Sequence, residues 1–233
     1  MATSSQIQVI NFDVQPTEKR FVKEFPNCSR CAIIGPSGAG KSNVLMTILL
    51  YKKPMEVIYL CSRTAHQEKY QLLENLIKMC NERTKKTKKK IRFFKVTPDT
   101  LQPPASTLPN SILIFDDCLA DNQNKIAAHF QHSRHDNNSL YYLTQSYSKI
   151  PKKSGIRENF NMFLLFKMDL VNLRQIYLEH VSDLASFEQF KNLCNVCWAR
   201  DRYSFLTMDP ENEDPKNRYK RNFGTSCIVN NHN

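Results

Sequence analysis

Glycine is scarce in this chain, and so are long apolar segments. There are five glycines among 233 residues, and three of them lie within residues 35–42. The longest apolar run, residues 44–51, is far too short to span a bilayer. The N-terminus lacks the basic flank and apolar stretch of a secretory signal. From these features we expect a soluble, intracellular chain that is neither transmembrane nor secreted and has no membrane partner.

The eight cysteines also indicate an intracellular chain. Without a secretory signal, they are better interpreted as reduced thiols than as a disulfide framework. The pairs Cys28/Cys31 and Cys194/Cys197 have the spacing of zinc ligands. However, Cys31 falls inside a predicted apolar strand, and the two pairs are very far apart in the sequence. Buried core thiols are therefore the favoured interpretation, and a structural zinc site is the alternative.

Positive charge is in excess and is spread along the chain. The chain has 33 basic and 22 acidic side chains, which gives a formal net charge of +11. The lysine run at residues 85–90 explains only part of this excess. A polyanionic partner is plausible, but charge alone does not distinguish nucleic acid from an anionic membrane surface. The contacts with such a partner could come from residues 85–90 or from residues 149–153.

Strand-like and helix-like segments alternate along most of the chain. The predicted strands are residues 29–34, 56–61, 91–96, 111–115, 140–144, 162–166 and 203–208. Helices are predicted at 41–51, 67–80 and 122–132, with two more after residue 172. This alternation predicts an α/β fold with a mostly parallel central sheet flanked by helices. We expect a single domain at residues 1–208 and a basic polar tail at residues 209–233.

The glycine-rich segment fits the phosphate-loop pattern G-x-x-x-x-G-K-[ST], also called the Walker A motif. Its residues are Gly35, Pro36, Ser37, Gly38, Ala39, Gly40, Lys41 and Ser42. Glycines let the backbone curl so that successive N–H groups point inward, and the following helix adds its positive end. The loop is therefore predicted to bind the phosphates of ATP. Lys41 would bridge the β- and γ-phosphates, and Ser42 would bind Mg²⁺.

Two further strands end in polar side chains that suit the same site. Asp116 and Asp117 follow the apolar strand at 111–115, which makes them a Walker B pair. Asp116 would hold Mg²⁺, and Asp117 would polarise the attacking water or, alternatively, cap the next helix. Gln145 ends the following strand and could sense the γ-phosphate or orient water.

Hydrolysis also benefits from a cation placed at the developing charge, often an arginine from a neighbouring subunit. Arg134 is the first candidate. It lies between a helix and the next strand, on the sheet edge away from its own nucleotide, and could act only in trans. Arg157 is the second candidate, and for both the alternative is a solvated surface charge.

Taken together, these segments resemble a known family, the FtsK/HerA-type genome-packaging ATPases of double-stranded DNA viruses such as poxviruses, virophages and Polinton or Maverick elements. The resemblance covers residues 29–167. It depends above all on residues 133–147, SRHDNNSLYYLTQSY, followed by Ile150-Pro151 and by IREN at 156–159. A glutamate often follows the first acid in this superfamily, whereas this chain has the shorter Asp117.

The resemblance implies an extra strand between the Walker A and Walker B strands and a homo-oligomeric ring, pentamer or hexamer. Such a ring hydrolyses ATP to drive double-stranded DNA into a capsid, with capsid or portal vertex proteins as partners. It implies a location in host cytoplasm or nucleus at virion assembly sites, or in the virion. No nuclease domain is expected after residue 208. The alternatives are a HerA-like cellular or plasmid translocase, a P-loop small-molecule kinase, and a non-enzymatic nucleotide-gated DNA-binding protein.

Overall fold

The computed structural model describes residues 26, 28–51, 56–83, 90–181, 183–184 and 186–227. The lysine run at 85–90, one of the two segments expected to contact DNA, lies outside the described residues except for Lys90. Among the helices within these ranges, none combines the length and the apolar character needed to cross a lipid bilayer.

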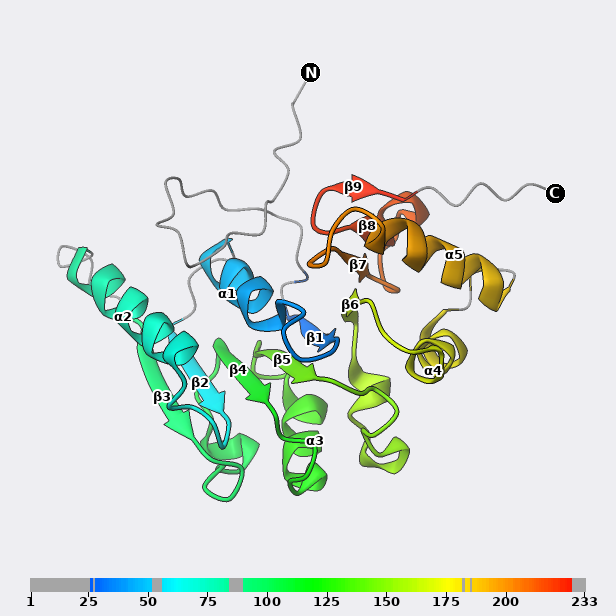
Figure 1. Ribbon diagram of the computed structural model, residues 1–233. Coiled ribbons are helices and arrows are strands. Elements are labelled where there is room, and N and C mark those ends of the chain that lie inside the picture. The colour runs from blue at the N-terminus through cyan, green and yellow to red at the C-terminus, as the bar shows by residue number, and fades with distance from the viewer. Residues whose placement is uncertain are drawn as a thin grey trace.

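The core of the molecule is a nine-stranded sheet with the strand order β3-β2-β4-β5-β1-β6-β7-β8-β9 (Figure 1). From β3 to β6 in this order, each strand is parallel to its neighbour. β7, β8 and β9 then continue the sheet with antiparallel pairing. Their bounds are β1 Arg30–Ile34, β2 Val57–Cys61, β3 Arg92–Val96, β4 Ser111–Asp116, β5 Ser139–Thr144, β6 Met162–Phe166, β7 Phe205–Met208, β8 Tyr219–Arg221 and β9 Thr225–Ser226. Because β5 separates β1 from β4, the extra strand expected between the Walker A and Walker B strands is confirmed.

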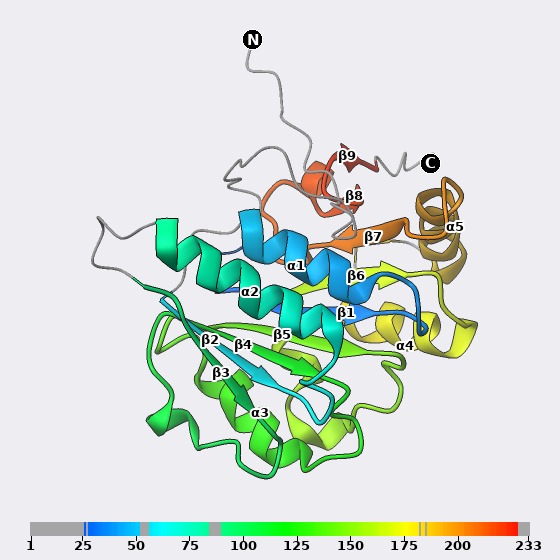
Figure 2. The same cartoon turned by 60° about the vertical axis from the view of Figure 1, so that its left-hand side comes forward.

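Helices cover both faces of this sheet. Helices α1 (Lys41–Tyr51) and α2 (Glu68–Arg83) pack on one face, and α3 (Gln123–His132), α4 (Leu170–His180) and α5 (Phe187–Trp198) pack on the other. Figure 2 shows α1 and α2 side by side over the strands, with α3 beneath them. The predicted α/β architecture with a mostly parallel, helix-flanked sheet is confirmed.

Each central strand contributes to two hydrophobic cores because its side chains alternate between the faces. In β1, Cys31 and Ile33 face α1 and α2, whereas Ala32 and Ile34 face the opposite core. Cys194 and Cys197 of α5 belong to that opposite core. The two Cys-x-x-Cys pairs therefore do not come together, and no group of three or more possible metal ligands occurs among the described residues. Cys31, Cys194 and Cys197 are buried core thiols.

The sheet continues beyond residue 208, where we expected a polar tail. β8 pairs with β7 through Leu206–Arg221, Thr207–Lys220 and Met208–Tyr219, and β9 pairs with β8. The aromatic rings of Tyr219 and Phe223 are buried against the two cores. The described residues after 208 thus add strands to the sheet, because these aromatic residues bury apolar surface that the basic composition of the segment conceals.

Candidate nucleotide site

The carboxyl ends of three neighbouring parallel strands define the site. Ile34 of β1 lies opposite Thr144 of β5, and Leu143 of β5 lies opposite Asp116 of β4. The Gly35 N–H donates to the Thr144 carbonyl at 3.2 Å, so the phosphate loop leaves β1 beside the last residue of β5. Ligands bind outside the carboxyl ends of strands in open α/β sheets. The structure therefore brings the loop, the acidic pair and the strand-end glutamine to one edge, as the parallel topology predicted.

The loop has the backbone geometry that its glycines permit. Gly38 and Gly40 have φ angles of +72° and +96°, a left-handed region that other residues rarely adopt. Gly35 is required for a different reason, because a Cβ atom there would lie 2.6 Å from Phe166 Cβ at the end of β6. Helix α1 begins at Lys41, so its first N–H groups and its positive dipole end face the loop.

The Lys41 side chain folds back onto the start of the phosphate loop. Its Nζ atom donates to the carbonyls of Gly35 at 2.7 Å and Pro36 at 2.9 Å. Burial lowers the pKa of this ammonium group below its usual value, and the nearby Asp116 carboxylate partly opposes that shift. The arrangement holds a cation beside the glycine-rich loop and the N-terminus of α1, which together suit a polyphosphate anion.

Asp116 and Ser42 share one cationic partner, Lys69 of α2. Lys69 Nζ lies 3.0 Å from Ser42 Oγ and 3.1 Å from Asp116 Oδ2, and the Tyr70 hydroxyl also donates to Asp116 Oδ2. The Asp116 carboxylate is buried, so it needs such partners. Burial, reinforced by Asp116, raises the pKa of Tyr70 well above its usual range, which keeps its hydroxyl a donor.

These residues fit the predicted magnesium site. A hydroxyl and a carboxylate oxygen, the hard ligands that Mg²⁺ takes, already converge on a single positive charge. Ser42 and Asp116 would hold the ion, which when bound would neutralise charge on the phosphates. Lys69 occupies the position between them, so metal binding requires its side chain to move.

Asp117 follows on the solvent side of Asp116. It is exposed and has a φ angle of +58°, an uncommon conformation for a residue other than glycine. The alternative that it caps the next helix is wrong, because α3 is capped by Asn122, whose side chain accepts from the Asn124 N–H. The left-handed turn instead directs the chain away after β4 and leaves the Asp117 side chain at the cleft. Strained backbone of this kind is frequent at functional sites.

Gln145 is exposed at the same cleft, and the residues after it are tightly held. The Ser146 N–H donates to Thr144 Oγ1 at 3.1 Å. The buried side chain of Asn172 in α4 accepts from Ser146 Oγ at 3.1 Å and from the Ser148 N–H at 2.8 Å. The backbone around Gln145 is therefore anchored, while its amide is available to a ligand.

Arg157 does not have the exposure that the second trans-arginine candidate needs. Its side chain is 5% exposed, donates to Glu179 Oε1 at 2.9 Å and to the Ser148 carbonyl at 2.7 Å, and lies over the Tyr147 ring. Burial opposes ionisation of Glu179, but the Tyr147 hydroxyl and Arg157 outweigh it and lower the Glu179 pKa. Arg157 therefore stabilises the fold of its own chain. Its place in a basic segment of the sequence did not indicate this burial.

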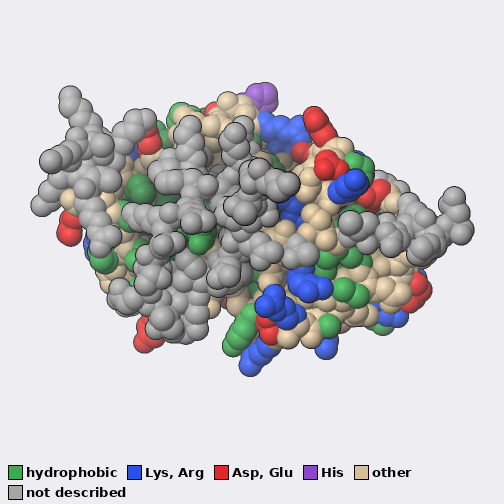
Figure 3. Space-filling view, turned by 90° about the horizontal axis from the view of Figure 1, so that it is seen from above, with side chains coloured by type: hydrophobic (Ala, Val, Ile, Leu, Met, Phe, Trp, Pro, Cys, Tyr) green, Lys and Arg blue, Asp and Glu red, His purple; other side chains and the backbone are tan. Residues whose placement is uncertain are grey.

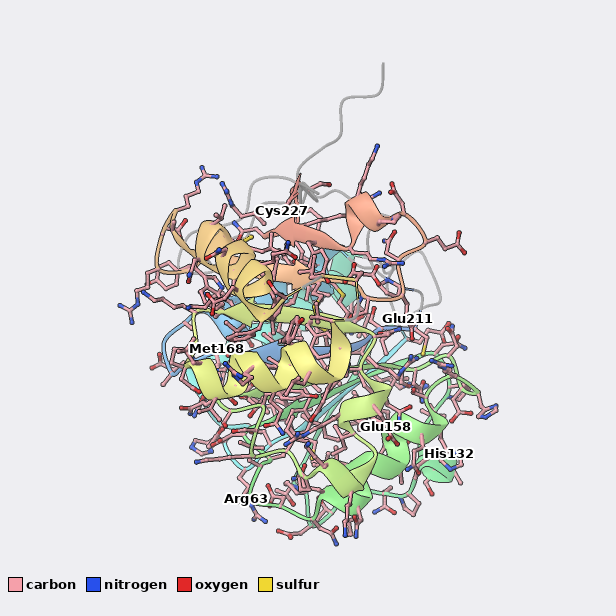
Figure 4. All side chains as sticks on the ribbon, turned by 90° about the vertical axis from the view of Figure 1, so that its right-hand side faces the viewer. Arg63, His132, Glu158, Met168, Glu211 and Cys227 are labelled. Carbon is pink, nitrogen blue, oxygen red and sulfur yellow. The ribbon has the colours of Figure 1, made fainter. Side chains whose placement is uncertain are left out.

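Arg134 lies where the sequence placed it, on the opposite edge of the sheet. Its side chain is 66% exposed and lies 3.5 Å from Glu211. Figure 4 shows Glu211 and His132 at one end of the molecule, whereas Met168 and Arg63, which follow β6 and β2, lie at the other end. Arg134 therefore cannot reach the phosphate loop of its own chain, and a role in hydrolysis remains a prediction for a neighbouring subunit.

The site as a whole is a cleft of about 680 Å³ at the carboxyl edge, within the usual range for small-molecule sites. Predicted residues that line it include Ser37 to Ser42, Asp116, Asp117 and Gln145. Sequence reasoning missed Lys69, Lys149 and Tyr203, which also line it. The sequence offered a weak indication for Lys69, since it lies in the first turn of the helix after β2, but nothing local distinguishes Tyr203.

The fold is that of a P-loop NTPase, with the phosphate loop after β1 and the acidic pair after β4 of a mostly parallel sheet. Solved structures share it. The genome-packaging NTPase B204 of Sulfolobus turreted icosahedral virus 2 in complex with sulfate matches with a TM-score of 0.56 and 15% identity, over 88% of this chain and 99% of that one. The complex of the same protein with AMP matches with a TM-score of 0.54 and 13% identity, over 88% and 100%.

A third structure is B204, described as the DNA-packaging ATPase of Sulfolobus turreted icosahedral virus. It matches with a TM-score of 0.54 and 15% identity, over 87% of this chain and 99% of that chain. No protein-family model matches the sequence, and no curated protein matches it either. At these identities the likeness establishes the fold alone.

Proposed function

We propose that this chain is an ATP-hydrolysing motor that moves double-stranded DNA into a viral capsid. The observation that carries the proposal is the single cleft in which the phosphate loop, Lys41, Asp116, Asp117 and Gln145 converge. A phosphate-binding loop alone serves many nucleotide-binding proteins. The added acidic pair and the strand-end amide are the groups that hydrolysis of the γ-phosphate requires.

Each residue has a definite part in this chemistry. The loop N–H groups and Lys41 hold the β- and γ-phosphates, and Ser42 and Asp116 hold Mg²⁺. Asp117 accepts a proton from the attacking water, and Gln145 orients that water or reports loss of the γ-phosphate. The cleft is open to solvent at Asp117 and Gln145, so water reaches the site from that side.

The packaging role is supported by two independent lines. The block at residues 133–147 resembles FtsK/HerA-type packaging ATPases, and the fold matches a protein described as a genome-packaging NTPase over nearly its whole length. Other structures of that protein hold AMP and AMPPCP, which supports an adenine nucleotide as the ligand of this cleft. A capsid or portal vertex would be the docking partner, at sites of virion assembly.

A homo-oligomeric ring, pentamer or hexamer, would explain the position of Arg134. Its exposed guanidinium lies on the edge opposite the cleft, next to Glu211. In a head-to-tail ring, that edge of one subunit faces the cleft of the next, which lets Arg134 approach a neighbour's γ-phosphate. Within one chain, Arg134 is too far from the phosphate loop to contact the γ-phosphate.

Contacts with DNA would come from dispersed charge. Figure 3 shows Lys and Arg side chains in several groups on the face seen from above, with acidic groups among them. Of the segment at 149–153, Lys149 lines the nucleotide cleft and Lys152 lies 3.5 Å from Glu179, while Lys153 is exposed. Lys153 is thus the residue of this segment that is best placed for a phosphate contact, and such contacts predict weaker DNA binding at high salt.

The test is steady-state ATP hydrolysis by the purified protein, with and without linear duplex DNA. We expect DNA to stimulate hydrolysis, and we expect Lys41→Ala and Asp117→Asn to abolish the stimulated rate. Lys78→Ala is the matched lysine control, because Lys78 is exposed on the outer side of α2 and pairs with Glu74 of the same helix. Mixing Arg134→Ala subunits with Asp117→Asn subunits would then show whether Arg134 acts in trans.

The outcomes separate the alternatives. A rate that is indifferent to DNA but rises with a small phosphate acceptor would sink the motor and leave a P-loop kinase. DNA binding that needs Lys41 but survives loss of both Asp117 and Gln145, without turnover, would indicate a nucleotide-gated DNA-binding protein. DNA-stimulated hydrolysis without binding to capsid proteins would favour the HerA-like translocase.

A further inference from the structure

Tyr203 is an exposed aromatic residue beside the phosphate loop. It lies between α5 and β7, is 55% exposed, and lines the cleft with the loop residues. Its Cδ1 atom lies 3.4 Å from the position that a Cβ atom on Gly40 would take. Figure 2 shows the loop before α1 and the start of β7 at the same end of the sheet. The ring therefore sits next to the phosphate-binding backbone, on the side of β1 away from the acidic pair.

The position of this ring is set by its own turn. Asp201 Oδ1 accepts from the Tyr203 N–H at 2.8 Å, and the Asp201 carbonyl accepts from the Ser204 N–H at 3.2 Å. Ser204 and Phe205, which follow, are buried, so the turn is fixed to the start of β7. The backbone that carries the ring is thus fixed at the cleft before any ligand arrives, which reduces the entropy lost on binding.

We propose that Tyr203 is the stacking platform for the base of the bound nucleotide, an inference that rests on the proposed nucleotide-binding function. The two halves of the ligand then separate across β1. The γ-phosphate lies toward Asp116 and Gln145 of β4 and β5, and the base lies toward the β6 and β7 side, where Tyr203 stands. Aromatic side chains stack on the π-face that every nucleic acid base has.

Arg202 contributes to the other half of the ligand. Its Nη2 atom lies 3.1 Å from the position of a Cβ atom on Gly38, at the tip of the phosphate loop, and its guanidinium lies over one side of the Tyr203 ring. A guanidinium at this position is placed for a charge-assisted hydrogen bond to a phosphate oxygen. Two adjacent residues of one turn would thus contact different parts of the ligand: Tyr203 the base and Arg202 the phosphates.

The experiment compares ATP with inorganic tripolyphosphate, which has the phosphates but no base. Dissociation constants are measured for both ligands with the full chain and with Tyr203→Ala, Tyr203→Phe, Arg202→Ala and Lys41→Ala. Phe94→Ala is the matched control, because Phe94 is a partly exposed aromatic on β3, at the far side of the sheet. Thermal unfolding of each variant checks that folding is intact.

Tyr203→Ala should weaken ATP binding by at least about 5-fold, the effect of losing one base–aromatic stack. Its affinity for tripolyphosphate should stay within about 2-fold of the wild type, and Tyr203→Phe should bind both ligands normally. Arg202→Ala should instead weaken both ligands together. Unchanged ATP affinity in Tyr203→Ala, or an equal loss for both ligands, would overturn the proposal. If Lys41→Ala weakens neither ligand, the nucleotide-binding function itself fails.

Discussion

Lys69→Met should strengthen the binding of a divalent cation between Ser42 and Asp116. The Lys69 ammonium donates to one oxygen of each residue, at 3.0 Å and 3.1 Å, and an incoming ion must displace it. A hydrogen bond to a charged group contributes about 1.5–3 kcal/mol. The Lys69 side chain is 31% exposed, and screening by solvent reduces this contribution to about 1 kcal/mol. Losing this competing contact should lower the cation concentration for half-saturation about 5-fold.

The assay is electron paramagnetic resonance of Mn²⁺, which reports occupancy without turnover. Free Mn²⁺ is titrated against the protein bound to the non-hydrolysable analogue AMPPCP. Lys78→Met on the same helix is the matched control and should resemble the wild type, because Lys78 is exposed and pairs with Glu74 at the surface. Asp116→Asn should weaken Mn²⁺ binding. Unchanged or weaker Mn²⁺ binding by Lys69→Met would refute the reasoning, since it would mean that Lys69 does not compete with the ion.

Two further predictions concern Arg157, Glu179 and His180, which lie behind the residues that follow Gln145. Arg157→Met should lower the free energy of unfolding by about 3 kcal/mol, because it leaves Glu179 without its buried partner, whereas Lys152→Met, which removes the exposed partner of the same carboxylate, should cost less than about 1 kcal/mol. Urea denaturation measures both, and equal losses would contradict the burial argument. Burial lowers the pKa of His180 from 6.5 to about 4, so below pH 6.5 the unfolded chain binds a proton that the folded chain does not. Stability present above pH 6.5 should therefore be lost as the pH falls toward 4, by at most roughly 3 kcal/mol. His180→Gln should flatten this slope and His132→Gln, on the exposed side of α3, should not; a slope unchanged by His180→Gln would assign the effect elsewhere.

The position of the site followed from local sequence patterns. A parallel sheet brings the carboxyl ends of its strands to one edge, so residues that follow predicted strands can be placed together before any coordinates are known. The phosphate loop, Asp116 and Gln145 met this condition because each directly follows a short apolar segment. Their relative order across the sheet required β5 between β1 and β4, which came from the family resemblance and not from periodicity.

Other features depend on contacts that no local pattern encodes. Lys69 reaches Asp116 from a helix 47 residues earlier in the chain, and Tyr203 reaches the phosphate loop from beyond α5. Arg157 sits among lysines in a polar segment, yet the fold buries it against Glu179. Asp117 was correctly placed at the cleft, but its left-handed backbone cannot be read from an aspartate. Tertiary packing decides each of these cases.

The anchoring of the Gln145 loop by Asn172 has a mechanical meaning. One side chain of α4 holds the residues on either side of Tyr147, and the same helix presents Leu170, Val171 and Leu178 to solvent, 56%, 69% and 73% exposed. A displacement of Gln145 on loss of a γ-phosphate would therefore be transmitted directly to this helix, whose exposed side chains include these three apolar residues. In the proposed ring, α4 would pass this displacement on to the neighbouring subunit that its apolar side chains contact.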